Sequence, residues 1–117
     1  MLIEVLKSKI GHARLTAAEL HYEGSITIDS NIIKAAGILP GEKVHVLNEN
    51  NGVRLETYVI AGKPGSGEFC LNGPAARLGI VGDVLVILSY AFCTPDEAKH
   101  LQAKVVYLDQ KNQVKKP

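Results

Sequence analysis

The segment ENNGVRLETYVIAG, residues 49–62, contains the strongest structural signal in the chain. Asn51-Gly52 lies between two runs of alternating polarity, and both residue types tolerate a positive φ, so we expect a β-hairpin turn here. After the turn, side chains should alternate between the two faces of a strand. One face would carry Val53, Leu55, Thr57 and Val59, and the other Arg54, Glu56, Tyr58 and Ile60.

Further strands and short helices are expected on both sides of this hairpin. Alternating or β-branched runs predict strands at 2–10, 13–20, 26–29, within 39–49 after a Pro-Gly turn, and at 69–72, 82–92 and 103–109. Short helices are predicted at 30–37 (capped by Asp29 or Ser30 and ended by Gly37), at 73–79 (started by Pro74) and at 94–101. This pattern predicts a mainly β chain: a single β-barrel domain over residues 1–117 with short capping helices.

The composition is typical of a soluble globular protein, with 46% hydrophobic and 21% charged residues. The formal net charge of +1 is too small for non-specific phosphate binding, so we expect no nucleic-acid partner. Lys111, Lys115 and Lys116 are expected to form a solvated tail. The longest apolar run, DVLVILSYAF, is too short to span a bilayer, and the first residues lack the apolar core of a signal peptide. We therefore expect a cytoplasmic protein with no membrane contact.

The cysteines, histidines and glycine-rich loop do not form a recognisable site. Cys70 and Cys93 lack metal-type spacing, and we expect two buried, reduced thiols. The histidines have no i, i+4 pair, which argues against a metal site. The loop GKPGSGE, residues 62–68, lacks the strand-to-helix transition and Lys-Ser/Thr pair of a phosphate-binding loop.

Gly24-Ser25 lies between strand-like segments in ELHYEGSITID, residues 19–29. A serine hydroxyl can attack the carbonyl group before it and convert the amide to an ester, provided that the peptide is held in a strained conformation. Glycine before the serine makes unusual backbone conformations accessible, because it has no Cβ. Most Gly-Ser pairs are simply turns, so this pair alone leaves both interpretations open.

Several separated motifs occur together and in order: KSKI, LHYEGSITID, NNGVRLETYVI, LNGPAA and VGDVLVILSY. In these motifs, from about Met1 to Tyr90, the chain resembles aspartate 1-decarboxylase, the pyruvoyl-dependent family that makes β-alanine for pantothenate and coenzyme A synthesis. The resemblance implies a double-psi β-barrel and a cytoplasmic homotetramer with active sites between subunits. It also implies self-cleavage between Gly24 and Ser25, which leaves a covalent pyruvoyl group that binds L-aspartate as a Schiff base. Neither pyridoxal phosphate nor a metal is then expected.

The resemblance further implies a role for individual residues. Ser25 is the pyruvoyl precursor, Gly24 supplies the scissile carbonyl group, and Thr57 hydrogen-bonds that carbonyl during ester formation. Tyr58 is the catalytic proton donor to the carbanion that decarboxylation leaves. The implied substrate-binding residues are the cations Lys9 and Arg54, Thr57, and the pocket-lining Asn72, Gly73, Pro74, Ala75 and Ala76.

One motif departs from the family pattern. Relatives commonly have Lys-hydrophobic-His-Arg near the start, where this chain has Lys9-Ile10-Gly11-His12. The difference puts an accessory polar contact near the pocket in question. The need for a maturation helper protein and the choice of carboxylate bound by Arg54 also stay open. The alternative to an enzyme is a non-catalytic ligand-binding or regulatory β-barrel.

Overall fold

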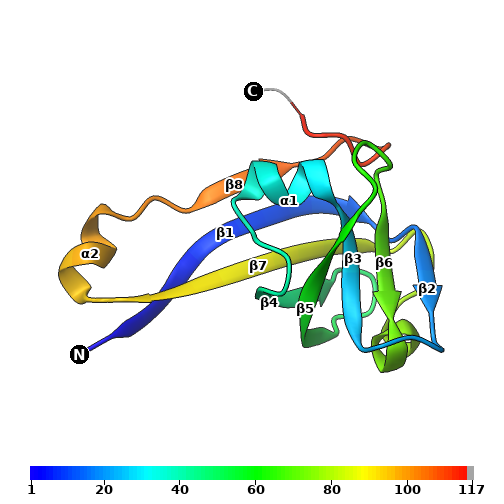
Figure 1. The fold of residues 1–117 in the computed structure, drawn as a ribbon, viewed down its shortest axis with the longest axis horizontal. Coiled ribbons are helices and arrows are strands. Elements are labelled where there is room, and N and C mark those ends of the chain that lie inside the picture. The colour runs from blue at the N-terminus through cyan, green and yellow to red at the C-terminus, as the bar shows by residue number, and fades with distance from the viewer. Residues whose placement is uncertain (116–117) are drawn as a thin grey trace.

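The computed structural model describes residues 1–115, which form a mainly β chain with short helices (Figure 1). The strands are β1 (Ile3–Arg14), β2 (Ala17–Glu19), β3 (Ser25–Asp29), β4 (Lys43–Asn48), β5 (Arg54–Gly62), β6 (Phe69–Asn72), β7 (Val84–Cys93) and β8 (Lys104–Tyr107). The helices are α1 (Ser30–Ala36), the 3₁₀ helix η1 (Gly73–Leu78) and α2 (Pro95–His100). The predicted fold class is confirmed, and the predicted elements are present, but the expected break between strands at 2–10 and 13–20 is wrong, because β1 continues to Arg14 and β2 covers only Ala17–Glu19.

The strands form a sheet that closes into a barrel, in the order β2-β6-β3-β5-β4-β7-β1-β8. β1 pairs with β7 as far as Arg14↔Val84, and the same chain segment then pairs with β6 from Ala17↔Cys70 as β2. This continuous segment joins the two sides of the sheet. The β3–β5, β2–β6 and β1–β8 pairs are parallel, and the hairpin pair β4–β5 is antiparallel.

The predicted hairpin between β4 and β5 is present, but the expected conformation of its turn is wrong. Gly52 has a φ of 78°, whereas Asn51 is not among the described residues with positive φ. The Gly52 N–H donates to the Asn48 carbonyl at 2.8 Å, and the Asn48 N–H donates to the Val53 carbonyl at 2.8 Å. The connection is therefore longer than a two-residue turn.

The Asp29 carboxylate joins α1 to the glycine-rich loop. As the N-cap, Asp29 accepts from the Asn31 N–H at 2.8 Å, and Gly37 ends the helix with a φ of 71°. Asp29 also accepts from the backbone N–H groups of Gly65, at 3.0 Å, and Gly67, at 2.9 Å. The backbone N–H groups of this loop therefore donate hydrogen bonds to a carboxylate of the same chain.

Glu42 fastens the loop between α1 and β4 to the β1–β7 pair. Its carboxylate lies 2.6 Å from Lys7 Nζ, accepts from the Leu39 N–H at 3.0 Å, and accepts from Ser89 Oγ. Burial raises the pKa of Glu42, but the hydrogen bonds from Lys7 and Ser89 contribute to a larger total lowering, so the net pKa lies below the ordinary 4.5. The carboxylate is therefore charged at neutral pH.

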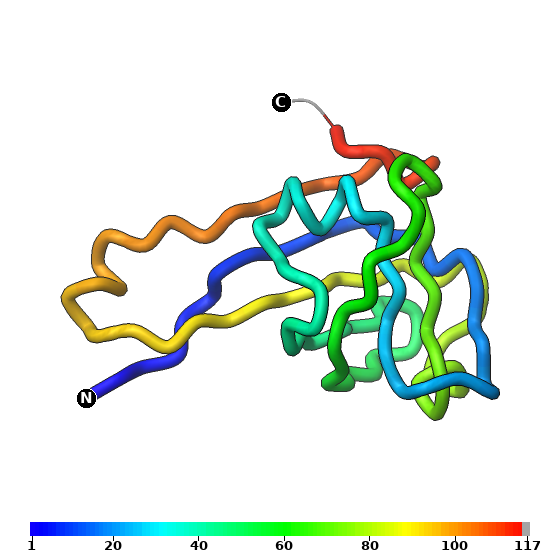
Figure 2. Tube along the Cα trace, viewed as in Figure 1, coloured from blue at the N-terminus to red at the C-terminus, as the bar shows by residue number. Residues whose placement is uncertain are grey.

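β1 and β7 extend beyond the barrel as a two-stranded arm that ends at α2 (Figures 1 and 2). Large apolar side chains are exposed along it, namely Met1, Leu2, Phe92 and Leu101. Both cysteines are free and Cys70 is buried, but Cys93 on the arm is half-buried. The prediction of two buried thiols is therefore wrong for Cys93, because its strand has left the core.

The prediction of a solvated C-terminal tail is only partly correct. Lys111 and Lys115 are exposed, and Lys116 lies outside the described residues. The segment between the first two is folded, because Asn112 is buried, has a φ of 55°, and donates through Nδ2 to the Arg14 carbonyl at 2.8 Å.

The sheet has a packed inner face and a half-exposed outer face over β5, β4, β7 and β1. Residues paired on neighbouring strands point to the same side. The inner face includes Ile10, Ile26, Ile28, Val44, Val46, Val59, Leu85 and Ile87, which are fully buried. The outer face carries Arg54, Glu56 and Tyr58 of β5, then Lys43, His45 and Leu47 of β4, then Val86, Leu88 and Tyr90 of β7, and Lys9 of β1.

Within the described residues, no helix has both the length and the apolar character to cross a membrane.

Candidate functional site

Ser25 begins β3 and is fully buried, whereas Gly24 before it is exposed. The Ser25 Oγ donates to the Glu23 carbonyl at 3.1 Å and accepts from Asn72 Nδ2 at 3.0 Å. Ser25 and Asn72 are direct partners across the antiparallel β3–β6 pair, so their side chains share one side of the sheet. Two hydrogen bonds thus fix the hydroxyl group of the predicted nucleophile, and neither is made with the Gly24 carbonyl that it would attack.

Asn72 connects Ser25 to two further side chains. Its Nδ2 also donates to Thr27 Oγ1 at 2.9 Å, and its Oδ1 accepts from Cys70 Sγ at 3.2 Å. Cys70 is 7% exposed and pairs with Thr27 across the same two strands. The sequence motifs placed Asn72 in the site but missed Cys70 and Thr27. Period-2 alternation in FCLN and SITID, which puts all four side chains on one face, is the signal that could have found them.

Gly73 packs directly against the Gly24 backbone. Its φ is 68°, and a Cβ at this position would lie 2.8 Å from the Tyr22 carbonyl oxygen and 2.9 Å from both N and Cα of Gly24. The φ of Gly24 is outside the positive range, and a Cβ there would meet Cδ of Pro74 at 3.9 Å. In this structure, therefore, the geometric requirement for glycine falls on Gly73 rather than on Gly24.

The rest of the predicted pocket lining follows β6 as the helix η1. Pro74 is exposed, and Ala75 and Ala76 are half-buried. Because η1 follows directly from Asn72, these small residues lie beside the start of β3. Their contact with substrate stays a prediction.

Tyr58 and Thr57 lie on β5, the strand next to β3. The parallel register of the two strands starts at Ile26↔Val59; continued back by one residue it sets Tyr58 level with Ser25, and by two residues Thr57 level with Gly24. Tyr58 is half-buried on the outer face, and Thr57, as its neighbour along the strand, points to the inner face. Tyr58 therefore lies on the strand adjacent to the one that begins at Ser25. The hydrogen bond between Thr57 and the Gly24 carbonyl stays a prediction.

Arg54 begins β5, at the other end of the outer face from Tyr58. Its Nη1 lies 3.4 Å from His45 Nδ1, and His45 Nε2 lies 3.3 Å from Glu56 Oε1. The guanidinium is exposed and lines a surface hollow of about 240 Å³. Four strand residues correspond to a backbone separation of about 13 Å between Arg54 and Tyr58 along β5.

Lys9 lies on β1 and also belongs to the outer face. It pairs with Leu88 of β7, which pairs in turn with His45 of β4. Three strands separate β1 from β3, which corresponds to about 19 Å along the sheet. The ion pairs found within residues 1–115 include neither Lys9 nor Arg54. The structure gathers these two cations on one face, away from Ser25 of the same chain.

The departure at Gly11-His12 coincides with an aromatic contact. A Cβ at Gly11 would lie 2.7 Å from Cδ1 and Cε1 of Tyr107, so the tyrosine ring fills the space of a side chain. His12 has a φ of 62°, and its ring centroid is 5.0 Å from that of Tyr107. A register shift between Ile10 and Ala13 interrupts β1 here. Tyr107, at the end of β8, therefore packs directly against the backbone of Gly11.

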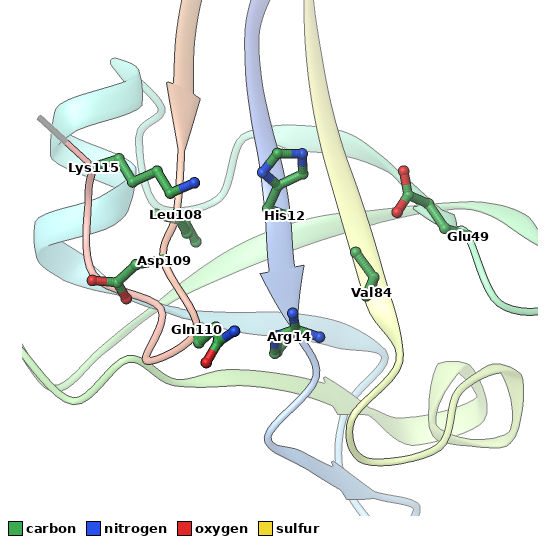
Figure 3. Close-up of a pocket in the computed structure, with 8 residues that line it drawn as sticks. All are labelled: His12, Arg14, Glu49, Val84, Leu108, Asp109, Gln110 and Lys115. Atoms are coloured by element: carbon green, nitrogen blue, oxygen red, sulfur yellow. The ribbon is translucent and has the colours of Figure 1, made fainter. Parts of the chain in front are cut away.

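A separate hollow of about 540 Å³ opens beside this contact (Figure 3). Figure 3 shows β1 and β7 between Glu49 and the C-terminal turn, with Val84 on β7. The residues that line this hollow are His12, Arg14, Glu49, Val84, Leu108, Asp109, Gln110 and Lys115. The predicted site residues lie elsewhere. Within residues 1–115, no group of three or more His, Cys, Asp or Glu side chains could hold a metal ion.

The family model and the curated relatives that match this chain carry the same description. Residues 1–115 match the family model described as aspartate decarboxylase. Aspartate 1-decarboxylase of Chloroherpeton thalassium is 53% identical over 116 residues, which cover 99% of this chain and 85% of the relative. The enzyme of the same name from Caldicellulosiruptor saccharolyticus is 56% identical over 116 residues, covering 99% and 91%. Among solved structures, the rationally designed mkDPBB_sym_86 protein aligns with 68% of this chain and 91% of its own, at a TM-score of 0.49 and 19% identity.

Proposed function

Since the chain belongs to the aspartate decarboxylase family, we propose that it makes a pyruvoyl group from its own Ser25 and uses it to decarboxylate L-aspartate. The activity itself, conversion of L-aspartate to β-alanine and carbon dioxide in pantothenate biosynthesis, follows from the family and argues against a non-catalytic barrel. The observation that carries the proposal is the buried Ser25 Oγ, held by Asn72 at 3.0 Å immediately after Gly24.

Self-cleavage would begin with addition of Ser25 Oγ to the Gly24 carbonyl carbon and loss of the hydroxyl proton. The C–N bond then breaks, the Ser25 nitrogen takes up a proton, and an ester joins Gly24 to the Ser25 side chain. Loss of the Ser25 α-proton breaks the Cβ–Oγ bond and releases Gly24 as a carboxylate. Water then displaces the nitrogen as ammonia and leaves a ketone. Asn72 donates to the attacking Oγ, and Thr57 is level with the oxyanion that forms on Gly24.

The surroundings of Ser25 fit a carbonyl group at this position. The residue is fully buried beside the Asn72 amide, a donor that is freed when Oγ leaves with Gly24, and the ketone oxygen then comes from water. The pyruvoyl group supplies an electron-accepting carbonyl that condenses with the substrate amine. Tyr58, level with Ser25 on the neighbouring strand, is placed to deliver a proton to the substrate Cα after carbon dioxide leaves.

Arg54, assisted by Lys9, is proposed to hold the β-carboxylate that the product retains. The α-carboxylate loses its charge as it becomes carbon dioxide. A tight ion pair with that group would stabilise the ground state more than the transition state and slow the reaction. Arg54 suits the other carboxylate because a guanidinium binds carboxylates in a bidentate manner and this one is exposed.

A site shared between two copies of the chain accounts for the positions of these residues. Lys9 lies on β1, with three strands between it and β3, and Arg54 lies four residues along β5 from Tyr58, so we propose that a second copy presents these cations to Ser25. The apolar side chains exposed on the arm formed by β1 and β7 would be covered in such an assembly. These observations support the homotetramer that the family resemblance implies.

Three further properties are proposed on the same basis. The family membership and the parallel strand pairs support a double-psi form of the barrel. A continuous hydrophobic cluster supports a single domain over residues 1–117. The enzyme is proposed to act in the cytoplasm, and incomplete cleavage of the purified chain would indicate a maturation helper.

Complementation between two inactive variants tests the shared site. Arg54→Ala and Ser25→Ala chains, unfolded together and refolded as a mixture, should regain aspartate decarboxylation. One chain then contributes an intact Ser25 and its neighbour an intact Arg54. The matched control is a mixture of Arg54→Ala and Lys9→Ala, in which every site lacks one cation, so activity should stay absent. Activity in the control mixture, or none in the first with mixed oligomers present, would contradict the shared site.

A further inference from the structure

We propose that the Cys70 thiol is a positioning group for self-cleavage: it sets the orientation of the Asn72 amide, which holds the Ser25 hydroxyl for attack. The inference rests on the proposed cleavage between Gly24 and Ser25. Cys70 lies on β6 and acts on the reacting atoms only through Asn72.

The geometry places four polar side chains in two cross-strand pairs, Ser25 with Asn72 and Thr27 with Cys70. Every polar atom of the Asn72 side chain is engaged: Nδ2 donates to Ser25 Oγ at 3.0 Å and to Thr27 Oγ1 at 2.9 Å, and Oδ1 accepts from Cys70 Sγ at 3.2 Å. The other acceptor near the thiol, the Leu71 carbonyl, is farther away at 3.9 Å. The amide oxygen is therefore the preferred partner of the thiol.

The thiol distinguishes between the two orientations of the amide. An S–H group is a donor and sulfur is a weak acceptor, so the thiol favours Oδ1 as its neighbour. With Oδ1 facing Cys70, the two amide hydrogens face Ser25 and Thr27. Rotation of the amide by half a turn would instead place Oδ1 against both hydroxyls and its NH₂ group against sulfur.

The orientation matters because Ser25 Oγ becomes negative as it attacks. An amide hydrogen directed at Oγ stabilises that charge, whereas an amide oxygen would repel it. In the observed orientation the Ser25 hydroxyl proton points to the Glu23 carbonyl, and Asn72 donates to the oxygen. Without the thiol, the rotated amide would be more populated and fewer chains would be ready to react.

The protonation state of the thiol fits this role. Burial raises the pKa of Cys70, the negative charges of Glu68 and Glu19 raise it further, and a hydrogen bond with the Glu19 backbone lowers it by less, so the net pKa is raised. The thiol therefore keeps its proton at neutral pH and remains a donor. A thiolate would attract the NH₂ group and repel Oδ1.

The test compares cleavage rates of Cys70→Ala and Cys70→Ser with wild type, using denaturing mass spectrometry to follow loss of the intact chain. Cys70→Ala removes the donor and should slow cleavage about twofold to tenfold, the effect of one neutral hydrogen bond. Cys70→Ser keeps a donor and should stay within about twofold of wild type. Cys93→Ala, which removes the other cysteine, is the matched control and should cleave at the wild-type rate.

Thermal unfolding of the Cys70 variants in the Ser25→Ala background, where no chain is cut, measures their effect on stability. It therefore separates a positioning role of the thiol from a packing role. If Cys70→Ala does not fold, Cys70→Val takes its place, because it fills the space without a donor. Wild-type cleavage by a folded variant without the donor would overturn the inference, and so would equal slowing by the serine variant. A wild-type chain that stays intact under every condition would instead overturn the proposed cleavage and this inference with it.

Discussion

Replacing Gly73 with alanine should destabilise the protein, because the methyl group would enter space that the Gly24 backbone occupies. A φ of 68° costs a residue with a Cβ about 1–2 kcal/mol. Contacts of 2.8 Å with the Tyr22 carbonyl oxygen and 2.9 Å with Gly24 require backbone movement, which costs about 1–3 kcal/mol more. The free energy of unfolding should therefore fall by about 2–5 kcal/mol.

Gly52→Ala is the matched control, because Gly52 has a φ of 78° and a Cβ added there would meet nothing within 4 Å. It should cost only the backbone contribution, about 1–2 kcal/mol. The assay is urea unfolding of both variants in the Ser25→Ala background, so that uncut chains are compared. If Gly73→Ala were no more destabilising than Gly52→Ala, the described packing of Gly73 against Gly24 would be wrong.

Three other predictions concern turnover, substrate choice and pH. Tyr58→Phe should cleave normally but release carbon dioxide about 10²–10⁴-fold more slowly per processed chain; near-normal turnover would remove Tyr58 as proton donor. Arg54→Lys should raise the Michaelis constant for aspartate, and wild type should use asparagine very poorly; equal use of both amino acids would refute binding of the β-carboxylate. Glu42→Gln should lower stability by about 1 kcal/mol at pH 7. Because the folded-state pKa of Glu42 is lowered, its contribution is present above the unfolded value of 4.5 and is lost as pH falls through the folded one. Urea unfolding at several pH values would show a constant difference if this assignment were wrong.

Local chemistry was sufficient to predict the elements of the fold. Asp29 and Gly37 marked the ends of α1, and alternation marked β5, because caps and strand faces depend on neighbouring residues. The turn at Asn51-Gly52 was predicted as a hairpin but with the wrong conformation. Its shape depends partly on Asn48, whose Nδ2 donates to the Leu78 carbonyl at 3.2 Å, a contact between distant parts of the chain.

The site was predictable only as far as the motifs extend. They named Ser25 and Tyr58, and the structure places these residues on adjacent strands. The packing of Gly73 on Gly24 and the hydrogen bond from Asn72 to Ser25 depend on the register of β3 and β6, which alternation alone does not determine. The separation of Lys9 from β3 likewise follows from the order of strands in the sheet.

Denaturing mass spectrometry of the purified, active protein tests the central claim most directly. If Ser25 is the source of the pyruvoyl group, the sample should contain fragments of residues 1–24 and 25–117. The larger should have a blocked N-terminus that reacts with a hydrazine. Ser25→Ala should still fold, since only one hydroxyl is lost. Because that hydroxyl is the nucleophile, the variant should stay a single intact chain without activity. An intact wild-type chain that decarboxylates aspartate, with no carbonyl available to hydrazine, would contradict the claim.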